Sequence, residues 1–279
     1  MGDKIMQPRI AAIVMTSNEA LNIGKCLESL AGCDAVFILD SNSTDGTLDI
    51  AANYKNARVM QVKWEGYAAT FNRGVELAKD FDWILRIDAD EELFGDIVGA
   101  IGKISDKVDG IIVRRTICFQ GEPLKFGPHA NAKMLRLFRS GRGGCELTNS
   151  DEHITVVGET QYFPDILVLD RDNKPFSQWL TKHVRWAKKE AASILEGGRT
   201  AASDNVDSHN KAKRVMKMSV YYRAPPYLRA MLYFLYRFII CRECLGGLNG
   251  ISWCVIQGLW YRLLIDFYIL FPENIDERL

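Results

Sequence analysis

Residues 83–93 read WILRIDADEEL, and this stretch decides the fold. Apolar residues at positions 83–85 and 87 indicate a buried strand that runs directly into Asp88 and Asp90. Side chains two apart on a strand point to the same side, so both carboxylates are expected together just past the strand's end. Open α/β sheets bind their ligands at that edge.

Two convergent carboxylates repel each other unless a cation or protons lie between them. Oxygen-only ligation suits Mg²⁺ or Mn²⁺, which take one or two protein carboxylates and complete their shell with phosphate and water. The pair Asp88 and Asp90 therefore predicts a metal–diphosphate site. An acidic loop after a strand has the same short pattern, so the neighbouring segments must distinguish the two.

Those segments alternate between strand and helix patterns. Short apolar runs predict strands at residues 10–15, 35–39 and 57–62, and helical spacing of apolar residues follows at 21–30, 48–54 and 67–78. Alternation of strands and helices at this spacing along the chain is typical of βαβ units. The sequence thus predicts an α/β fold with a mostly parallel central sheet.

Polar residues follow the predicted strands. Asp40 ends the second strand and can accept a hydrogen bond from a base imide N–H, while Thr16 and Ser41 can bind ribose or the base edge. Each residue alone is also a common cap or turn residue. The chain has no G-x-G-x-x-G after the first strand and no G-x-x-x-x-G-K-[ST], which disfavours a dinucleotide enzyme and a P-loop NTPase.

The composition is that of a globular protein. The 279 residues are 48% hydrophobic and 25% charged with a formal net charge of zero, so no general polyanion binder is indicated. The opening MGDKIMQPRI lacks the apolar core of an export signal, and the seven cysteines are odd in number and scattered. These features favour a reducing cytosol.

Three motifs carry a specific resemblance. They are IVMTSNEALNIGKCLESL at 13–30, ILDSNSTDGT at 38–47 and FNRGVELAKDFDWILRIDADEEL at 71–93. In this order and spacing they resemble the N-terminal half of the family 2 glycosyltransferases, which have the GT-A fold. The subgroup most similar to this chain contains the lipopolysaccharide-core and exopolysaccharide glycosyltransferases.

The resemblance implies roles for individual residues. Asp40 would contact the uracil of a UDP-sugar, and Asp90 would hold the Mn²⁺ or Mg²⁺ that bridges the donor diphosphate, with Asp88 near the ribose and the metal. Arg73 would meet phosphate, although a surface salt bridge is an equal interpretation. The remaining residues that would line the nucleotide-sugar pocket are Thr16, Asn18, Glu19 and Ser41.

The middle of the chain is expected to carry the acceptor side. Lys133 and Arg136 can neutralise phosphate, although an exposed β face is the preferred interpretation of their segment. An inverting transferase needs a base for the acceptor hydroxyl. By resemblance that base is Glu152, with Asp151 as the second choice, and His153 would orient the carboxylate or help to hold the diphosphate. The same cluster would also suit a capping turn.

The C-terminal region changes character. Between residues 208 and 242 every charged side chain is basic, and aromatic and aliphatic residues lie between them. This composition is typical of helices that lie on an anionic membrane surface. The apolar stretch after residue 244 is interrupted by glycines, Arg262 and Asp266, so in-plane helices are expected rather than a transmembrane hairpin. A packed helical pair or a dimer interface is the alternative, and no nucleic-acid-binding motif accompanies the basic patch.

Residues 1–205 are therefore predicted to form a GT-A catalytic domain, with a nucleotide-binding half at 1–95 and an acceptor half at 96–205, followed by an amphipathic membrane-associating tail at 206–279. The resemblance implies an inverting, metal-dependent enzyme that transfers sugar from a UDP-sugar to a lipid-linked saccharide at the cytoplasmic face of a bacterial inner membrane. The alternatives are a polyprenyl-phosphate glycosyltransferase, a sugar-nucleotide nucleotidyltransferase and a non-catalytic membrane scaffold.

Overall fold

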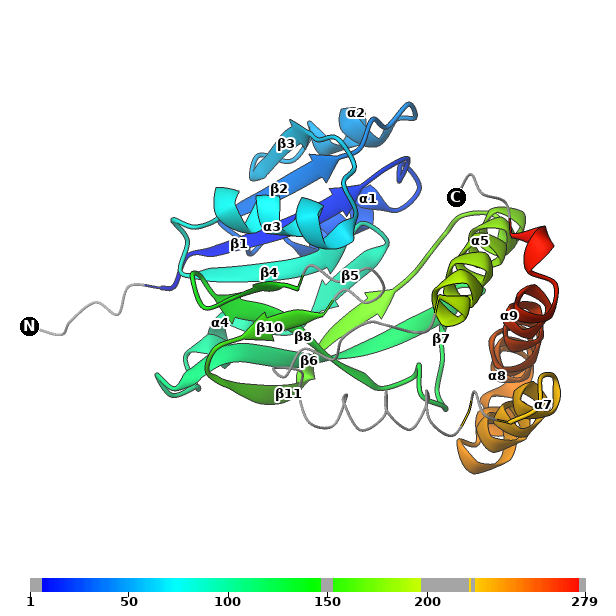
Figure 1. The fold of residues 1–279 in the computed structure, drawn as a ribbon. Helices are drawn as coiled ribbons and strands as arrows, with labels where there is room; N and C mark the ends of the chain where they lie inside the picture. Colours follow the sequence, from blue (N-terminus) through cyan, green and yellow to red (C-terminus); the bar gives the residue numbers. More distant parts are fainter. Residues whose placement is uncertain (1–6, 147–152, 197–220, 222–223, 276–279) are drawn as a thin grey trace, which may run out of the picture. The chain divides into compact units, whose positions relative to one another are not determined.

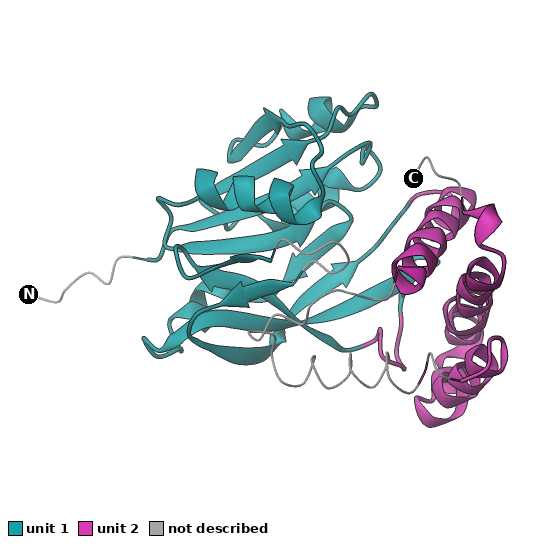
Figure 2. Cartoon of the chain, in the orientation of Figure 1, with its two compact units in different colours: residues 1–123, 131–147, 152–173 teal, residues 124–130, 148–151, 174–279 magenta. Residues whose placement is uncertain are grey.

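The computed structural model describes residues 7–146, 153–196, 221 and 224–275, and this part of the chain forms two compact units (Figure 2). Unit 1 comprises residues 1–123, 131–147 and 152–173. Unit 2 comprises residues 124–130, 148–151 and 174–279. Each unit is described by itself below.

Unit 1 is built on one large sheet (Figure 1). The order of its main strands is β3-β2-β1-β4-β8-β6-β11-β5, and β7 pairs with β6. A separate hairpin is formed by β9 and β10. The strands are β1 Ile10–Thr16, β2 Ala35–Asp40, β3 Ala57–Gln61, β4 Trp83–Asp88, β5 Glu91–Phe94, β6 Val108–Phe119, β7 Glu122–Pro123, β8 Ala132–Arg139, β9 Gly143–Cys145, β10 Ile154–Val156 and β11 Glu159–Asp170.

Most of this sheet is parallel, which confirms the predicted fold class. Strand β1 pairs in parallel with β2 and β4, β2 with β3, and β6 with β11. The antiparallel strand β8 joins the two parallel groups, because it pairs with both β4 and β6. Strand β5 lies antiparallel at the edge next to β11.

Both faces of the sheet are covered, as expected for parallel strands. In β1, Ile10, Ala12 and Val14 join the core on the side of α1, α2 and α4. The alternate residues Ala11 and Ile13 join the core on the side of α3 and the β9–β10 hairpin. The helices of unit 1 are α1 Ile23–Ser29, α2 Thr47–Ala51, α3 Tyr67–Leu77 and α4 Ile97–Ile101.

Unit 2 is helical. Its elements are α5 Phe176–Leu195, α7 Leu228–Leu235, the π-helical turn η2 Tyr236–Ile240, the short helix η3 Glu243–Gly246, α8 Gly247–Trp253, the π-helical segment η4 Cys254–Trp260, α9 Tyr261–Leu270 and η5 Pro272–Asn274. Helix α5 packs along α9 around a core that contains Ala187, Ala191 and Ile265. The domain boundary predicted at residue 205 lies outside the described residues. The structure nevertheless groups α5 with the C-terminal helices, since the unit boundary falls between Asn173 and Lys174.

The C-terminal helices differ from the predicted basic, aromatic surface. Arg229 and Arg237 are buried, and each pairs with an acid inside unit 2. The expectation that these two arginines face an anionic membrane is therefore wrong. The other basic residues of that prediction between positions 208 and 220, and Arg223, lie outside the described residues. Among the described helices, the stretch Glu243–Leu270 is long and apolar enough to cross a membrane by length and composition alone.

Candidate active site

The carboxyl ends of three neighbouring strands meet at one edge of the unit 1 sheet. Thr16 at the end of β1 is the register partner of Asp40 at the end of β2. On the other side of β1, Met15 is the register partner of Asp88, the last residue of β4. The structure thus brings together the polar strand ends that the sequence singled out. The Thr16 hydroxyl is buried and has no hydrogen-bond partner among the described residues, and such a group usually has one.

Asp40 is fully buried and organises the loop that follows it. Its carboxylate accepts hydrogen bonds from the Ser43 backbone N–H at 2.9 Å, from the Ser43 hydroxyl and from the Gln61 amide at 2.9 Å. An ionised carboxylate offers about four acceptor positions. Most of the acceptor capacity of Asp40 is therefore used within the protein, and its predicted contact with uracil stays a prediction.

Asn18 fastens the loop after β1 to the loop after β2. Its amide oxygen accepts from the Thr44 N–H at 2.8 Å, and its own N–H donates to the Ser43 hydroxyl at 2.9 Å. The left-handed backbone of Asn18, with φ of 56°, is a conformation that asparagine tolerates better than most residues. The Glu19 N–H donates to the Thr47 hydroxyl, and the Ser41 N–H donates to the Thr16 carbonyl. These predicted pocket residues therefore also hold together the loops that follow β1 and β2.

The prediction that Asp88 and Asp90 point to the same side because they lie two apart on one strand is wrong. Strand β4 ends at Asp88, residues 89 and 90 form a turn, and β5 begins at Glu91. Strand alternation therefore does not relate the two aspartates. The Asp90 carbonyl accepts from the Arg171 N–H at 2.7 Å, which anchors the turn to the segment after β11.

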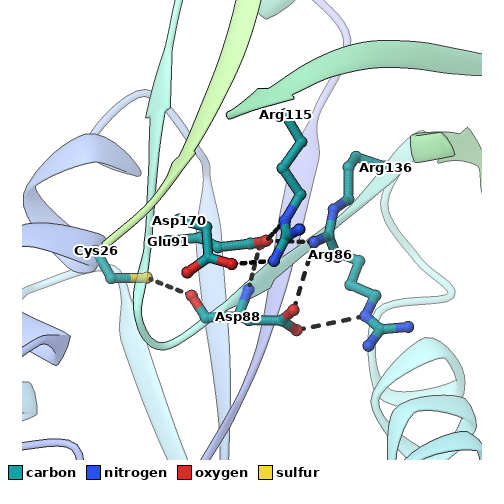
Figure 3. Close-up of polar contacts among 7 residues, drawn as sticks. All are labelled: Cys26, Arg86, Asp88, Glu91, Arg115, Arg136 and Asp170. Atoms are coloured by element: carbon teal, nitrogen blue, oxygen red, sulfur yellow. Dashed lines mark hydrogen bonds and ion pairs between the residues drawn. The ribbon is translucent and has the colours of Figure 1, made fainter. Parts of the chain in front are cut away.

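Arginines surround the Asp88 carboxylate (Figure 3). Arg86 Nε lies 3.5 Å from one oxygen, and Arg136 Nη2 lies 3.4 Å from the other. Burial alone would raise the pKa of Asp88, but the charges of Arg136, Arg86 and Arg115 hold the pKa of this carboxyl well below its usual range. Asp88 is therefore a carboxylate anion at neutral pH.

Glu91 is the centre of this cluster, and the sequence did not reveal it. The fully buried Glu91 carboxylate pairs with Arg136 and, at 2.8 Å, with Arg115, and it accepts the Asp88 N–H at 3.0 Å. Arg115 also pairs with Asp170 from β11 (Figure 3). The one available signal was Arg86, a charged residue inside an apolar strand pattern. Because buried charges are normally paired, it indicated that a cluster of paired charges lies near the end of this strand.

Arg136 and Lys133 behave differently, although they lie on the same strand. Lys133 is exposed, with its ammonium 4.5 Å from the centre of the Tyr162 ring. Arg136 is almost completely buried and pairs with Glu91 and Asp88. Lys133 therefore lies on an exposed β face, as expected, and its contact with phosphate stays a prediction. The expectation of an exposed face is wrong for Arg136, whose guanidinium belongs to the Asp88 cluster.

The remaining predicted site residues are Arg73, His153, Asp151 and Glu152. Arg73 is exposed on α3, and His153 is half-buried directly before β10, where its carbonyl accepts the Glu146 N–H at 3.2 Å. Asp151 and Glu152, the candidate bases, lie outside the described residues. Their catalytic assignment stays a prediction.

The residues present are compatible with a divalent metal that is completed by a ligand. No group of three or more His, Cys, Asp or Glu side chains placed to hold a metal occurs among the described residues. A Mg²⁺ or Mn²⁺ ion bound with a diphosphate needs only one or two protein carboxylates. The ionised Asp88 supplies such a hard oxygen donor, and Asp90 lies two residues further along the turn.

Comparison with known proteins gives the family. The model of the glycosyl transferase family 2 matches residues 11–156. The lipopolysaccharide core biosynthesis glycosyltransferase LpsC of Rhizobium meliloti (strain 1021) is 32% identical over 146 residues, which is 50% of this chain and 54% of LpsC. An uncharacterized glycosyltransferase of Rickettsia bellii (strain RML369-C) is 38% identical over 91 residues, 32% of this chain and 30% of that protein. The chain thus spans about half or less of the length of these relatives.

Among solved structures, S. aureus TarS 1–349 is 13% identical, with 97% of this chain and 93% of that chain covered and a TM-score of 0.44. The family match covers the strands β1, β2 and β4, whose polar ends form the candidate site, and it includes Asp88, Glu91 and Arg136. The family assignment rests on this match, which extends over more than half of the sequence. The chain belongs to the glycosyl transferase family 2.

Proposed function

We propose that this protein is an inverting, metal-dependent glycosyltransferase that takes a UDP-sugar as its donor. The observation that carries the proposal is the edge where β1, β2 and β4 end. There Asp88 is ionised among three arginines, and the buried Thr16 hydroxyl has no hydrogen-bond partner within the described part of the chain. Open α/β sheets bind nucleotides at such an edge. Thr16, Asn18, Glu19, Asp40 and Ser41 are the proposed nucleotide contacts.

Asp90 and Asp88 would hold Mn²⁺ or Mg²⁺ at the donor diphosphate. The bound ion would act as a Lewis acid that stabilises the negative charge on the departing UDP. Arg136 and Arg86 keep Asp88 ionised, and Glu91 keeps Arg136 in place. These residues therefore maintain a charged, oriented carboxylate without the metal having to displace a proton.

Glu152 is the proposed base, with Asp151 as the second choice. Inversion requires the acceptor hydroxyl to attack the anomeric carbon from the face opposite to UDP while a carboxylate accepts its proton. His153 would orient that carboxylate or contact the diphosphate, and Arg73 and Lys133 would meet phosphate groups from the surface. The expected loss on removing the base is about 10² to 10⁴-fold in kcat.

The acceptor is proposed to be a lipid-linked saccharide in the synthesis of lipopolysaccharide, capsule or exopolysaccharide. The similarity to LpsC, whose name places it in lipopolysaccharide core synthesis, supports this choice. A lipid-borne acceptor would place the enzyme at the cytoplasmic face of a bacterial inner membrane. The described apolar helices of unit 2 are compatible with that location.

The test is to measure donor binding and turnover separately. UDP and a panel of UDP- and GDP-sugars are titrated with and without Mn²⁺, and UDP release is followed with a lipid-linked acceptor. Asp90→Asn should lose both metal-dependent UDP binding and turnover. Glu152→Gln should keep UDP binding and lose turnover, because the base acts on the acceptor.

Asp106→Asn is the matched control, since Asp106 is an exposed carboxylate of unit 1 outside the cluster. It should bind and turn over like the unmodified protein. An Asp90→Asn variant that keeps full Mn²⁺-dependent UDP affinity would count against the metal role. Failure of every sugar nucleotide to bind in the presence of Mn²⁺ would reject the glycosyltransferase proposal.

A further inference from the structure

In unit 2, α7 and η2 form the first arm of a helical hairpin, and α8, η4 and α9 form the second arm, which packs against it. This hairpin exposes an apolar surface. In the segment formed by α7 and η2, exposed apolar side chains recur every three or four residues, which places them on one helical face. The face continues around the turn of the hairpin into η3 and α8. Its exposed residues are Leu228, Met231, Leu232, Leu235, Tyr236, Ile239, Ile240, Leu245 and Leu248.

The charged residues of the same segment point inward. Arg229 Nε donates to the Asp266 carboxylate of α9 at 2.7 Å, and the Tyr227 N–H donates to its second oxygen, also at 2.7 Å. Arg237 donates to Glu243 at 2.6 Å, and both side chains are about 1% exposed. The hairpin therefore buries its ion pairs and exposes its aliphatic side chains, the reverse of a helix whose outer face meets water.

Water-exposed charge is almost missing from this region. Across residues 224–271, all of which the structure describes, Arg242 is the one charged side chain in the exposed class. Arg242 lies in the turn, three residues before Leu245. A contiguous exposed apolar surface of this kind marks a contact with an apolar partner rather than with solvent.

We propose that residues 228–248 form an insertion surface that enters one leaflet of a lipid bilayer. The acyl chains would cover the apolar face, and Arg242 would meet the lipid phosphates at the headgroup level. This inference goes beyond the proposed transfer reaction, which does not depend on which residues contact lipid. Binding is hydrophobic, so it requires neither an anionic lipid nor low salt.

Lipid explains this surface better than a second copy of the chain does. Exposure is greatest beside the turn, where Leu248 is 84%, Ile240 67% and Leu245 63% exposed, so these apolar side chains are covered by little of the described protein. A protein interface normally has an apolar centre and a polar, charged rim. Among residues 224–271, Arg242 is the one exposed charge that could form such a rim, whereas the hydrocarbon of a bilayer needs none.

The dimensions of the hairpin and its ion pairs favour insertion into one leaflet over a span across the membrane. The 13 residues of α7 and η2 extend for about 20 Å, less than the roughly 30 Å of a bilayer core. In the second arm, α9 packs on α5 and Arg262 pairs with Glu190 of α5 at 3.3 Å. Crossing would carry this pair and the lysines of α5 into hydrocarbon, which is costly.

Vesicle flotation tests the proposal. The full-length protein is mixed with neutral phosphatidylcholine vesicles and with vesicles that contain phosphatidylglycerol, each in 0.1 M and 1 M NaCl. We expect binding to both vesicles at both salt concentrations. The double variant Leu245→Gln with Leu248→Gln should bind at least about tenfold more weakly, because two exposed leucines no longer enter the hydrocarbon.

Leu21→Gln is the matched control, since Leu21 is 61% exposed in unit 1, close to the 63% of Leu245. It should float like the unmodified protein. Circular dichroism of the double variant should match that of the unmodified protein, because both leucines are exposed. If the double variant loses its fold, Ile240→Gln alone is used in the same assay, with a reduction of several-fold expected.

Two results would overturn the proposal. Binding only to anionic vesicles that disappears in 1 M NaCl would assign the interaction to basic segments outside this surface. Absence of vesicle binding, together with a dimer in sedimentation that becomes a monomer in the double variant, would assign the surface to self-association. Neither measurement contains a sugar nucleotide, so the insertion surface and the proposed reaction can fail independently.

Discussion

A single buried carboxylate, Glu91, holds two arginines beside the candidate active site. It pairs with Arg136 and Arg115 and also accepts the Asp88 N–H. The buried Arg136 guanidinium and the partly buried Arg115 guanidinium would repel each other if this anion were absent. Glu91 therefore has a positioning role for Asp88, although the acidic run 88–92 gives no local sign of which carboxylate turns inward.

Glu91→Gln should lower the free energy of unfolding by about 3 to 5 kcal/mol, because removal of one partner leaves buried charges uncompensated. Glu92→Gln is the neighbouring control. Glu92 pairs with Arg171 at 3.2 Å in a more exposed position, so its loss should cost about 1 kcal/mol or less. Urea unfolding measures both. An equal decrease in the free energy of unfolding for the two variants would show that the Glu91 cluster stabilises the fold no more than the Glu92–Arg171 pair does.

At the scale of elements, the short helix η3 and helix α8 approach each other closely at Gly250. A Cβ atom placed on Gly250 would lie 2.7 Å from the Glu243 carbonyl oxygen, which is a backbone atom and cannot easily move. The same close packing places the Glu243 side chain against Gly127, where an added Cβ would also collide. Glycine at these positions lets the buried Arg237–Glu243 pair form at the turn of the hairpin.

Gly250→Ala should therefore destabilise unit 2 by about 1 to 3 kcal/mol, the usual cost of overpacking. Gly246→Ala is the matched control, because the nearest atom to its added Cβ would be 4.0 Å away, in ordinary contact with Phe126. Thermal unfolding followed by tryptophan fluorescence compares the two variants. A Gly250→Ala protein as stable as Gly246→Ala would contradict the close approach.

At the scale of the whole molecule, the two proposed surfaces belong to different units. The strand ends of β1, β2 and β4 lie in unit 1, and the insertion surface 228–248 lies in unit 2 (Figure 2). Each unit has a hydrophobic core of its own. Binding of UDP and binding of lipid should therefore protect different segments of the chain.

Hydrogen exchange tests this separation. UDP with Mn²⁺ should slow exchange at residues 16–20, 40–47 and 88–92, because ligand binding stabilises the native state around its site. Neutral vesicles should slow exchange at 228–248 and leave the strand ends unchanged. The controls are UDP without metal and vesicles with the Leu245→Gln, Leu248→Gln protein. Slower exchange at residues 228–248 on addition of UDP and Mn²⁺ without vesicles would contradict the assignment of the two binding sites to separate units.

The sequence by itself determined the N-terminal strands of the sheet and the polar residues at their ends. Apolar runs and helical spacing are local signals, so the strands at 10–16, 35–40 and 83–88 follow from neighbouring residues. Parallel pairing then places Thr16, Asp40 and Asp88 at one edge, as predicted. The three family motifs lie in the same segments, and for that reason the family was evident from the sequence.

Only the tertiary structure decided which charges are buried and with which partners. Arg136 and Glu91 are 45 residues apart, and Arg229 and Asp266 are 37 apart. Composition shows a basic, aromatic tail, but whether an arginine faces water or an acid depends on contacts between distant elements. Burial of an arginine is tolerable only when an acid from elsewhere in the fold neutralises it. Because these arginines pair inward, the outer face of the hairpin is left apolar. The order of residues in the sequence does not show which side chains pair, so it could not predict this face.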